Sequence, residues 1–144
     1  MRVSECMSQD VRVAGPDNTM QSAAQIMADL DAGFLPVADH DRLIGIVTDR
    51  DIAIRGVGAG KPPETSVREV MSPEVKYCFQ DDEVEDVLAN MGDIQLRRLP
   101  VLDAGKRLVG IVSLSDLASD GEARRTGEAL GEITRPSERH SQRI

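Results

Sequence analysis

The chain has 144 residues, of which 40% are hydrophobic, and its formal net charge at pH 7 is −8. Its length suffices for one domain or for two similar halves, and its acidic balance argues against a nucleic-acid surface, which needs a cluster of Lys and Arg. With no Trp, one Tyr and two Phe, the core is expected to consist of aliphatic side chains and Met.

The chain contains an internal duplication. The motifs V-x-E-x-M-S, L-P-V and G-I-V-T-x-x-D occur in this order in the first half, and all three return in the second half, with Ser in place of Thr. Val3 of the first copy aligns with Val67 of the second, 64 positions later. We therefore expect two structural repeats. The chain then divides into a first repeat at 1–57, a linker at 58–65, a second repeat at 66–119 and a charged tail at 120–144.

Each repeat is expected to contain five short elements. In the first repeat a strand at 11–13 precedes a helix at 20–30, where apolar residues recur at helical spacing. A hairpin of strands at 34–38 and 43–47 follows, and a second helix covers 49–55. The order strand, helix, strand, strand, helix predicts a mixed α+β fold. The corresponding elements of the second repeat are expected at 75–77, 84–94, 98–102, 108–112 and 114–119.

The G-I-V-T-x-x-D motif ends a strand with a hydroxyl and places a carboxylate three residues later. These residues are Thr48 and Asp51 in the first repeat, and Ser113 and Asp116 in the second. The spacing predicts a helix N-cap, in which the hydroxyl accepts a backbone N–H bond and the acid reaches back. The same two groups can hold a small polyol phosphate. The motif by itself leaves both interpretations open.

No catalytic or metal-binding set is evident. Cys6 and Cys78 form no CxxC pair and have no zinc-type spacing, which also argues against a disulfide framework. His40 is in a predicted turn and His140 in the tail, and neither has an acid or a nucleophile at a useful spacing. We therefore expect no enzyme activity.

No targeting or membrane segment is evident either. The N-terminus lacks a basic region followed by an apolar run, and no segment approaches the roughly 18–20 apolar residues of a membrane span. We expect a cytoplasmic protein with neither membrane nor nucleic acid as a partner. The tail, rich in charge and poor in apolar residues, is expected to be disordered or loosely helical.

The ordered, duplicated motifs resemble a tandem pair of cystathionine-beta-synthase (CBS) domains, known as a Bateman module. The resemblance covers about residues 3–119, and no single motif is specific, whereas the ordered duplication is. It implies that each repeat packs a three-stranded sheet on two helices. It also implies that a pseudo-twofold axis relates the repeats and that two clefts lie between them.

In this family the clefts bind adenosine-containing ligands such as AMP, ATP, NAD or S-adenosylmethionine. The resemblance implies that Asp51 and Asp116 accept hydrogen bonds from ribose hydroxyls, and that Thr48 and Ser113 receive a phosphate. Main chain and apolar side chains surround the adenine, and basic side chains neutralise the phosphate. The other implied binding residues are Val13, Phe34, Leu35, Pro36 and Arg50 in the first repeat, and Tyr77, Cys78, Arg97, Arg98, Leu99 and Pro100 in the second, with Arg12 and Lys76 as further candidate cations.

The implied function is a regulatory sensor that requires no cofactor, forms a homodimer and acts on a separate, unknown protein. The alternative is a structural or interaction module whose clefts are unoccupied and whose T-x-x-D motifs only cap helices. The second repeat has Leu114 and Ser115 where the first has Asp49 and Arg50. Its cleft is therefore expected to offer fewer charges of its own.

Overall fold

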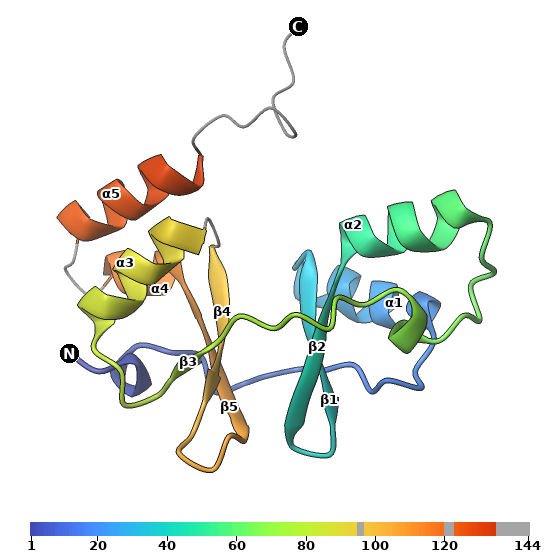
Figure 1. Ribbon diagram of the computed structural model, residues 1–144, viewed down its shortest axis with the longest axis horizontal. Coiled ribbons are helices and arrows are strands. Elements are labelled where there is room, and N and C mark those ends of the chain that lie inside the picture. Colours follow the sequence, from blue (N-terminus) through green and yellow to red (C-terminus); the bar gives the residue numbers. More distant parts are fainter. Residues whose placement is uncertain (95–96, 120–122, 135–144) are drawn as a thin grey trace, which may run out of the picture. The chain divides into compact units, whose positions relative to one another are not determined.

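The computed structural model describes residues 1–94, 97–119 and 123–134, and these residues form two compact units (Figure 1). We name each unit after its first α-helix. The α1 unit comprises Asp10–Lys76 with Gly105–Leu108. The α3 unit comprises Met1–Gln9, Tyr77–Ala104 and the described residues from Val109 onward. Both units combine helices with small sheets, so the predicted α+β class is confirmed.

The α1 unit contains the predicted helix and hairpin of the first repeat. The Thr19 side chain caps α1 by accepting a hydrogen bond from the Ser22 N–H at 3.0 Å, and α1 ends at Asp31, whose φ of 52° is left-handed. Strands β1 and β2 pair antiparallel. The helical run after β2 starts as α-helix and continues as a π-helical and then a 3-10 turn. These elements are α1 (Met20–Leu30), β1 (Phe34–Asp39), β2 (Arg42–Thr48), α2 (Asp49–Asp51), and the turns at Ile52–Gly56 and Val57–Ala59.

Instead of the strand expected at 11–13, the α1 unit has a single parallel bridge between Ala14 and Val37. The Ala14 N–H donates to the Pro36 carbonyl, and the Ala38 N–H donates to the Ala14 carbonyl, both at 3.0 Å. In a strand the N and the C=O of one residue point to the same side, so the missing N–H of Pro36 lies on this edge. Proline is tolerated there because only one bridge forms.

The α3 unit has a three-stranded sheet in the order β3-β4-β5, in which β3 runs parallel to β4. The first strand begins one residue after the stretch expected at 75–77. Part of the charged tail is helical, and this helix packs against α3 and α4 (Figure 1); residues 120–122 and 135–144 of the tail lie outside the described residues. The elements are β3 (Cys78–Phe79), α3 (Val84–Ile94), β4 (Arg98–Leu102), β5 (Leu108–Ser113), α4 (Leu114–Ser119) and α5 (Ala123–Ile133).

The compact units do not follow the sequence repeats, because each contains the V-x-E-x-M-S segment of the other repeat. In the α3 unit, Ser8 and Ile111 exchange two backbone hydrogen bonds, of 2.8 and 3.0 Å. In the α1 unit, Ser72 and Ile46 exchange an equivalent pair, also of 2.8 and 3.0 Å. The Met-Ser step of one repeat thus extends the sheet of the other, next to its G-I-V motif.

The glycine of each G-I-V motif is required because the backbone of the M-S segment passes close to it. A Cβ atom on Gly45 would lie 2.9 Å from the Ser72 carbonyl oxygen, and one on Gly110 would lie 2.9 Å from the Ser8 carbonyl oxygen. Distances below 3.0 Å to a backbone atom force the backbone to shift. The G-I-V motif of each repeat therefore contacts the M-S motif of the other repeat.

We expect Gly45→Ala to lower the free energy of unfolding by about 1–3 kcal/mol. The added Cβ atom would overlap a backbone oxygen, which can move only if the strand is distorted. Urea denaturation followed by circular dichroism measures this change. Gly127→Ala in α5 is the control, since a Cβ atom there meets nothing within 4 Å. Alanine should stabilise that helix by up to about 1 kcal/mol. Equal effects of the two substitutions would contradict the assigned contact.

Each unit has its own core, built from aliphatic side chains and Met as the composition predicts. Neither core contains a fully buried aromatic ring. No helix among the described residues is long and apolar enough to cross a membrane. The α1 unit buries Ala14, Met20, Ala23, Met27, Leu35, Val37, Val47, Val67 and Val70. The α3 unit buries Val3, Cys78, Val84, Val87, Leu88, Met91, Leu99, Val101, Val112, Leu114 and Leu117.

Candidate functional site

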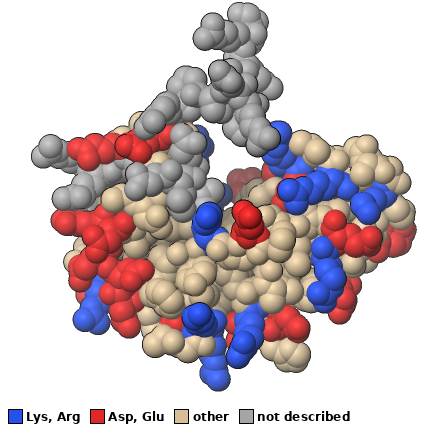
Figure 2. Space-filling model, viewed as in Figure 1, with Lys and Arg blue, Asp and Glu red and all other residues tan. Residues whose placement is uncertain are grey.

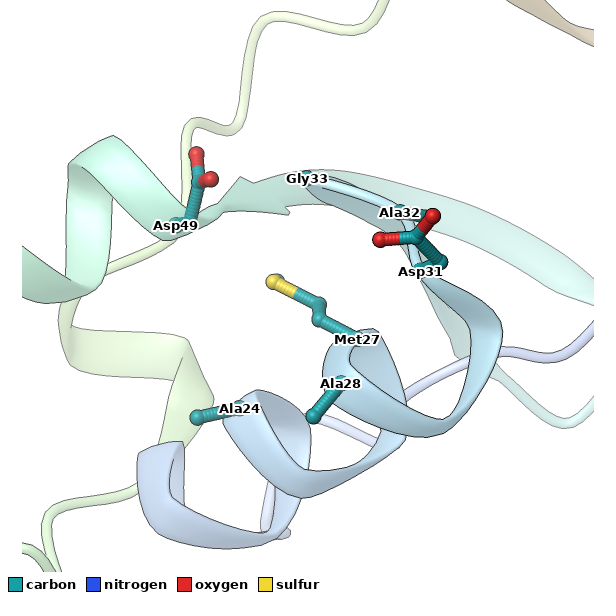
Figure 3. A pocket seen from close by; sticks show the side chains of 7 residues that line it. All are labelled: Ala24, Met27, Ala28, Asp31, Ala32, Gly33 and Asp49. Atoms are coloured by element: carbon teal, nitrogen blue, oxygen red, sulfur yellow. The ribbon is translucent and has the colours of Figure 1, made fainter.

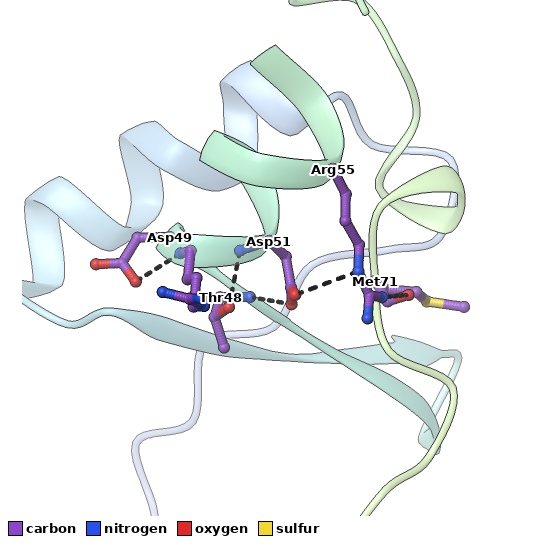
Figure 4. A network of polar contacts seen from close by, with 6 residues as sticks. Thr48, Asp49, Asp51, Arg55 and Met71 are labelled. Atoms are coloured by element: carbon purple, nitrogen blue, oxygen red, sulfur yellow. Dashed lines mark hydrogen bonds and ion pairs between the residues drawn. The ribbon is translucent and has the colours of Figure 1, made fainter. Parts of the chain in front are cut away.

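Thr48 and Asp51 form a reciprocal capping box at the start of the helical run in the α1 unit (Figure 4). The Asp51 N–H donates to Thr48 Oγ1 at 3.0 Å, and the Thr48 N–H donates to Asp51 Oδ2, also at 3.0 Å. The cap predicted from the spacing is confirmed. The two side chains therefore have a structural role whether or not a ligand binds.

The capping box leaves part of both side chains for other partners. Thr48 uses an acceptor position of its hydroxyl in the cap, so its O–H can still donate. Asp51 uses Oδ2, while Oδ1 lies 3.9 Å from Nε of Arg55, and the carboxylate is 17% exposed (Figure 4). Arg55 also donates to the Met71 carbonyl oxygen at 3.3 Å. Capping and ligand binding are thus compatible at this position.

The α3 unit repeats the same arrangement. The Asp116 N–H donates to Ser113 Oγ at 3.2 Å, and the Ser113 N–H donates to Asp116 Oδ2 at 3.1 Å. The Ser113 and Ser115 hydroxyls lie 2.9 Å apart. The second repeat therefore has one more hydroxyl beside its cap than the first, which has Arg50 at the position of Ser115.

A pocket of about 340 Å³ lies in the α1 unit between the end of α1 and the start of α2 (Figure 3). Asp31 and Asp49 stand on either side of it, and Met27 extends between them (Figure 3). The Asp49 N–H donates to the Gly33 carbonyl at 3.0 Å, which holds the two elements together. Of the predicted binding residues, none lines this pocket. Its lining is Ala24, Met27, Ala28, Asp31, Ala32, Gly33 and Asp49.

A pocket of about 270 Å³ occupies the related place in the α3 unit. The Leu114 N–H donates to the Arg97 carbonyl at 3.0 Å, the repeat equivalent of the Asp49–Gly33 bond. The pocket brings together three predicted residues, Arg97, Arg98 and Ser113, with Ser115 and two leucines. The described residues that line it are Arg97, Arg98, Ser113, Leu114, Ser115 and Leu130.

Sequence reasoning missed the contribution of α5 to this pocket. Leu130 comes from the charged tail, for which disorder and a loose helix were the expected states. The signal that points to it is the spacing of Leu130 and Ile133, which places two apolar side chains on one helix face. Ile133 packs against the core of the α3 unit.

Several predicted binding residues are core residues whose side chains face away from solvent. Leu35 and Leu99 are fully buried, and Pro36 and Pro100 are buried beside them. Contact between these residues and an adenine stays a prediction. Val13 and Tyr77, at equivalent positions of the two repeats, are each 38% exposed. The Tyr77 ring also packs edge-on against Phe79, with 5.6 Å between centroids.

Cys78 is a buried thiol. Burial, with smaller contributions from the nearby Asp82 and Cys6, raises its pKa to about 12. At neutral pH the group stays protonated, and a protonated thiol is a poor nucleophile and a poor metal ligand. Among the residues that the structure describes, no group of three or more His, Cys, Asp or Glu side chains is placed to hold a metal ion.

Charges of both signs are interspersed on the surface shown in Figure 2. Lys and Arg alternate there with Asp and Glu, and the basic side chains do not gather into one stripe on this face.

Comparison with known proteins gives one family. A family model described as CBS domain matches the chain twice, at residues 3–57 and 67–120. The CBS domain-containing protein YhcV of Bacillus subtilis is 38% identical over 133 residues, which cover 92% of this chain and 94% of that protein.

Solved structures of related proteins have the same fold as this chain. Hypoxic Response Protein I with two coordinated zinc ions matches with a TM-score of 0.75 and 37% identity, over 83% of this chain and 98% of that one. The CBS domain pair of protein MJ0100, in complex with 5′-methylthioadenosine and S-adenosyl-L-methionine, matches with a TM-score of 0.73 and 26% identity, over 86% and 98%.

Proposed function

This chain belongs to the CBS domain family, with two CBS domains in tandem, and from this we propose that it is a regulatory module that binds an adenosine-containing ligand. The ligand class comprises AMP, ATP, NAD and S-adenosylmethionine. The observation that carries the proposal is the duplicated hydroxyl–carboxylate pair, Thr48 with Asp51 and Ser113 with Asp116. Each pair keeps hydrogen-bonding capacity beyond its own capping box.

The ligand chemistry of a relative supports this proposal. The CBS domain pair of MJ0100 binds 5′-methylthioadenosine and S-adenosyl-L-methionine, which share an adenosine group. In this chain the carboxylates of Asp51 and Asp116 would accept from the ribose hydroxyls. Charge-assisted hydrogen bonds of this kind are about twice as strong as neutral ones.

Regulation would follow from differential binding. A ligand that prefers one arrangement of the two units, or of a homodimer, shifts the population toward that arrangement. The surface that is available to a partner protein changes with it. We assign the protein to the cytoplasm and give it a separate, as yet unidentified partner. A single gel-filtration peak at the monomer mass, with and without ligand, would overturn the homodimer.

The proposal is tested by thermal unfolding with and without ligand. At 100 times the dissociation constant, a ligand that binds only the folded state adds about 2.7 kcal/mol. For a chain of this size that raises Tm by roughly 5–11 °C. The screen uses AMP, ADP, ATP, NAD and S-adenosylmethionine at millimolar concentration, with GMP as a control for the base. An unchanged Tm with every adenine compound would contradict the proposal.

The second candidate function is a structural or interaction module whose sites take no ligand. The two capping boxes favour this alternative, because helix capping explains the hydroxyl and the carboxylate in each repeat without a ligand. An unchanged Tm in the screen above, together with a partner captured equally well with and without nucleotide, would support this alternative.

A further inference from the structure

Equivalent positions beside the two capping boxes differ in charge between the repeats. Four positions beside the capping boxes carry Gly33, Phe34, Asp49 and Arg50 in the first repeat, with one negative and one positive charge. The same four positions carry Arg97, Arg98, Leu114 and Ser115 in the second repeat, with two positive charges. The net charge is therefore 0 in the first set and +2 in the second.

In the α3 unit both arginines line the pocket, together with Ser113 and Ser115. Arg97 and Arg98 are exposed and stand at the start of β4. None of the described residues that line this pocket is an Asp or a Glu. The salt bridges found among the described residues involve neither arginine. Two arginines and two serines that line one pocket offer donors suited to a phosphate, because Arg binds phosphate oxygens bidentately and keeps its charge.

In the α1 unit the charges that line the pocket are negative. Asp31 and Asp49 flank it, and the rest of its lining is alanine, glycine and Met27 (Figure 3). Asp49 Oδ1 accepts the Arg50 N–H at 2.8 Å, which fixes this carboxylate at the start of α2. Thr48 does not line this pocket, but Asp49 follows it directly in the chain. A phosphate bound at Thr48 would therefore be repelled by the adjacent acidic pocket, whereas a neutral or cationic group would not be.

On these grounds we propose that the two sites accept different classes of adenosine ligand. The site of the α3 unit takes a phosphate-bearing nucleotide, and the site of the α1 unit takes an adenosine compound without phosphate. The inference rests on the proposed function, since it needs both sites to bind adenosine. The expectation that the second repeat offers fewer charges considered only the residues inside the T-x-x-D motif; over these four positions each repeat carries two charges, and the repeats differ in sign.

The test compares AMP with 5′-methylthioadenosine, which share the adenosine group and differ in the 5′ substituent. Isothermal titration calorimetry measures both on the full chain. In the double variant Arg97→Gln, Arg98→Gln, the Kd for AMP should rise about tenfold or more. The Kd for 5′-methylthioadenosine should stay within about twofold, since it carries no phosphate for the arginines to bind.

Two further variants separate pocket charge from total charge and from folding. The double variant Arg42→Gln, Arg68→Gln makes the same change in net charge at exposed positions outside both pockets, and it should leave both Kd values unchanged. The double variant Arg97→Lys, Arg98→Lys keeps the positive charge but loses the bidentate geometry, so it should raise the Kd for AMP less than the glutamine variant does. Thermal melts without ligand confirm that each variant is folded.

The acidic pocket is tested in the opposite direction. The double variant Asp31→Asn, Asp49→Asn should raise the AMP stoichiometry from about one to about two per chain, because the repulsion in the α1 unit is removed. An unchanged stoichiometry would overturn the assignment of the α1 site.

The outcomes distinguish the inference from the function on which it rests. If AMP and 5′-methylthioadenosine both bind the wild-type chain but lose affinity equally in the Arg97→Gln, Arg98→Gln variant, the charge assignment is wrong and the adenosine-binding function stands. An unchanged Kd for AMP in that variant would likewise show that the charge assignment is wrong, while the adenosine-binding function stands. If neither compound binds the wild-type chain, both the function and the inference fall.

Discussion

Replacing Leu99 with alanine is expected to lower the free energy of unfolding by about 2–5 kcal/mol. Leu99 is 0% exposed, is the second residue of β4 and belongs to the core of the α3 unit. The substitution removes three buried carbon atoms and leaves a cavity that the neighbouring strands and helices fill only in part. Leu35→Ala, the equivalent change in the α1 unit, should have an effect of similar size.

Urea denaturation followed by circular dichroism measures both changes. The control is Val57→Ala, since Val57 is 68% exposed and surface substitutions usually change stability by about 0.5 kcal/mol or less. A loss below about 1 kcal/mol for Leu99→Ala would show that β4 does not pack into the core as described.

The helices and hairpins could be predicted because their signals are local. The apolar spacing of Met20, Ala23 and Met27 defines one face of a helix, and the same three residues are buried in α1. The polar turns between the hairpin strands are likewise visible in the sequence. Local signals of this kind also located the capping boxes, because a box needs only a hydroxyl and an acid three residues apart.

The exchange of segments between repeats was not predictable in this way. Ser8 pairs with Ile111, more than 100 positions away, and nothing in either short motif states which repeat it will join. A duplicated motif also fits equally well against either copy of its partner. The strand expected at 11–13 also could not be predicted from local signals. Whether this segment forms a strand or a single bridge at Ala14 depends on tertiary contacts.

The lining of the two pockets could be anticipated only in part from the motifs. Arg97, Arg98 and Ser113 line one pocket, and their part in ligand binding stays a prediction. The pocket of the α1 unit is lined instead by Asp31 and Asp49. Asp31 ends a helix in a left-handed conformation, so its place beside Asp49 depends on how α1 meets β1.

Asp51→Asn has the largest expected effect on ligand binding. Asparagine keeps a carbonyl oxygen that can accept the Thr48 N–H, so the capping box can survive and the stability without ligand should change little. It loses the charge that strengthens hydrogen bonds from ribose hydroxyls. Each charge-assisted bond contributes about 1.5–3 kcal/mol, so losing one raises Kd roughly 10- to 150-fold.

Calorimetry with 5′-methylthioadenosine measures this effect, and Asp116→Asn with AMP is the matched experiment in the α3 unit. Asp29→Asn, an exposed acid on α1 outside both boxes, controls for the change in net charge. If Asp51→Asn and Asp29→Asn give the same Kd, the carboxylate of Asp51 contacts no ligand and serves only to cap the helix. If instead only Asp51→Asn weakens binding while the melting temperatures without ligand agree, the same side chain has both roles, because one carboxylate oxygen caps the helix and the other is left for the ribose.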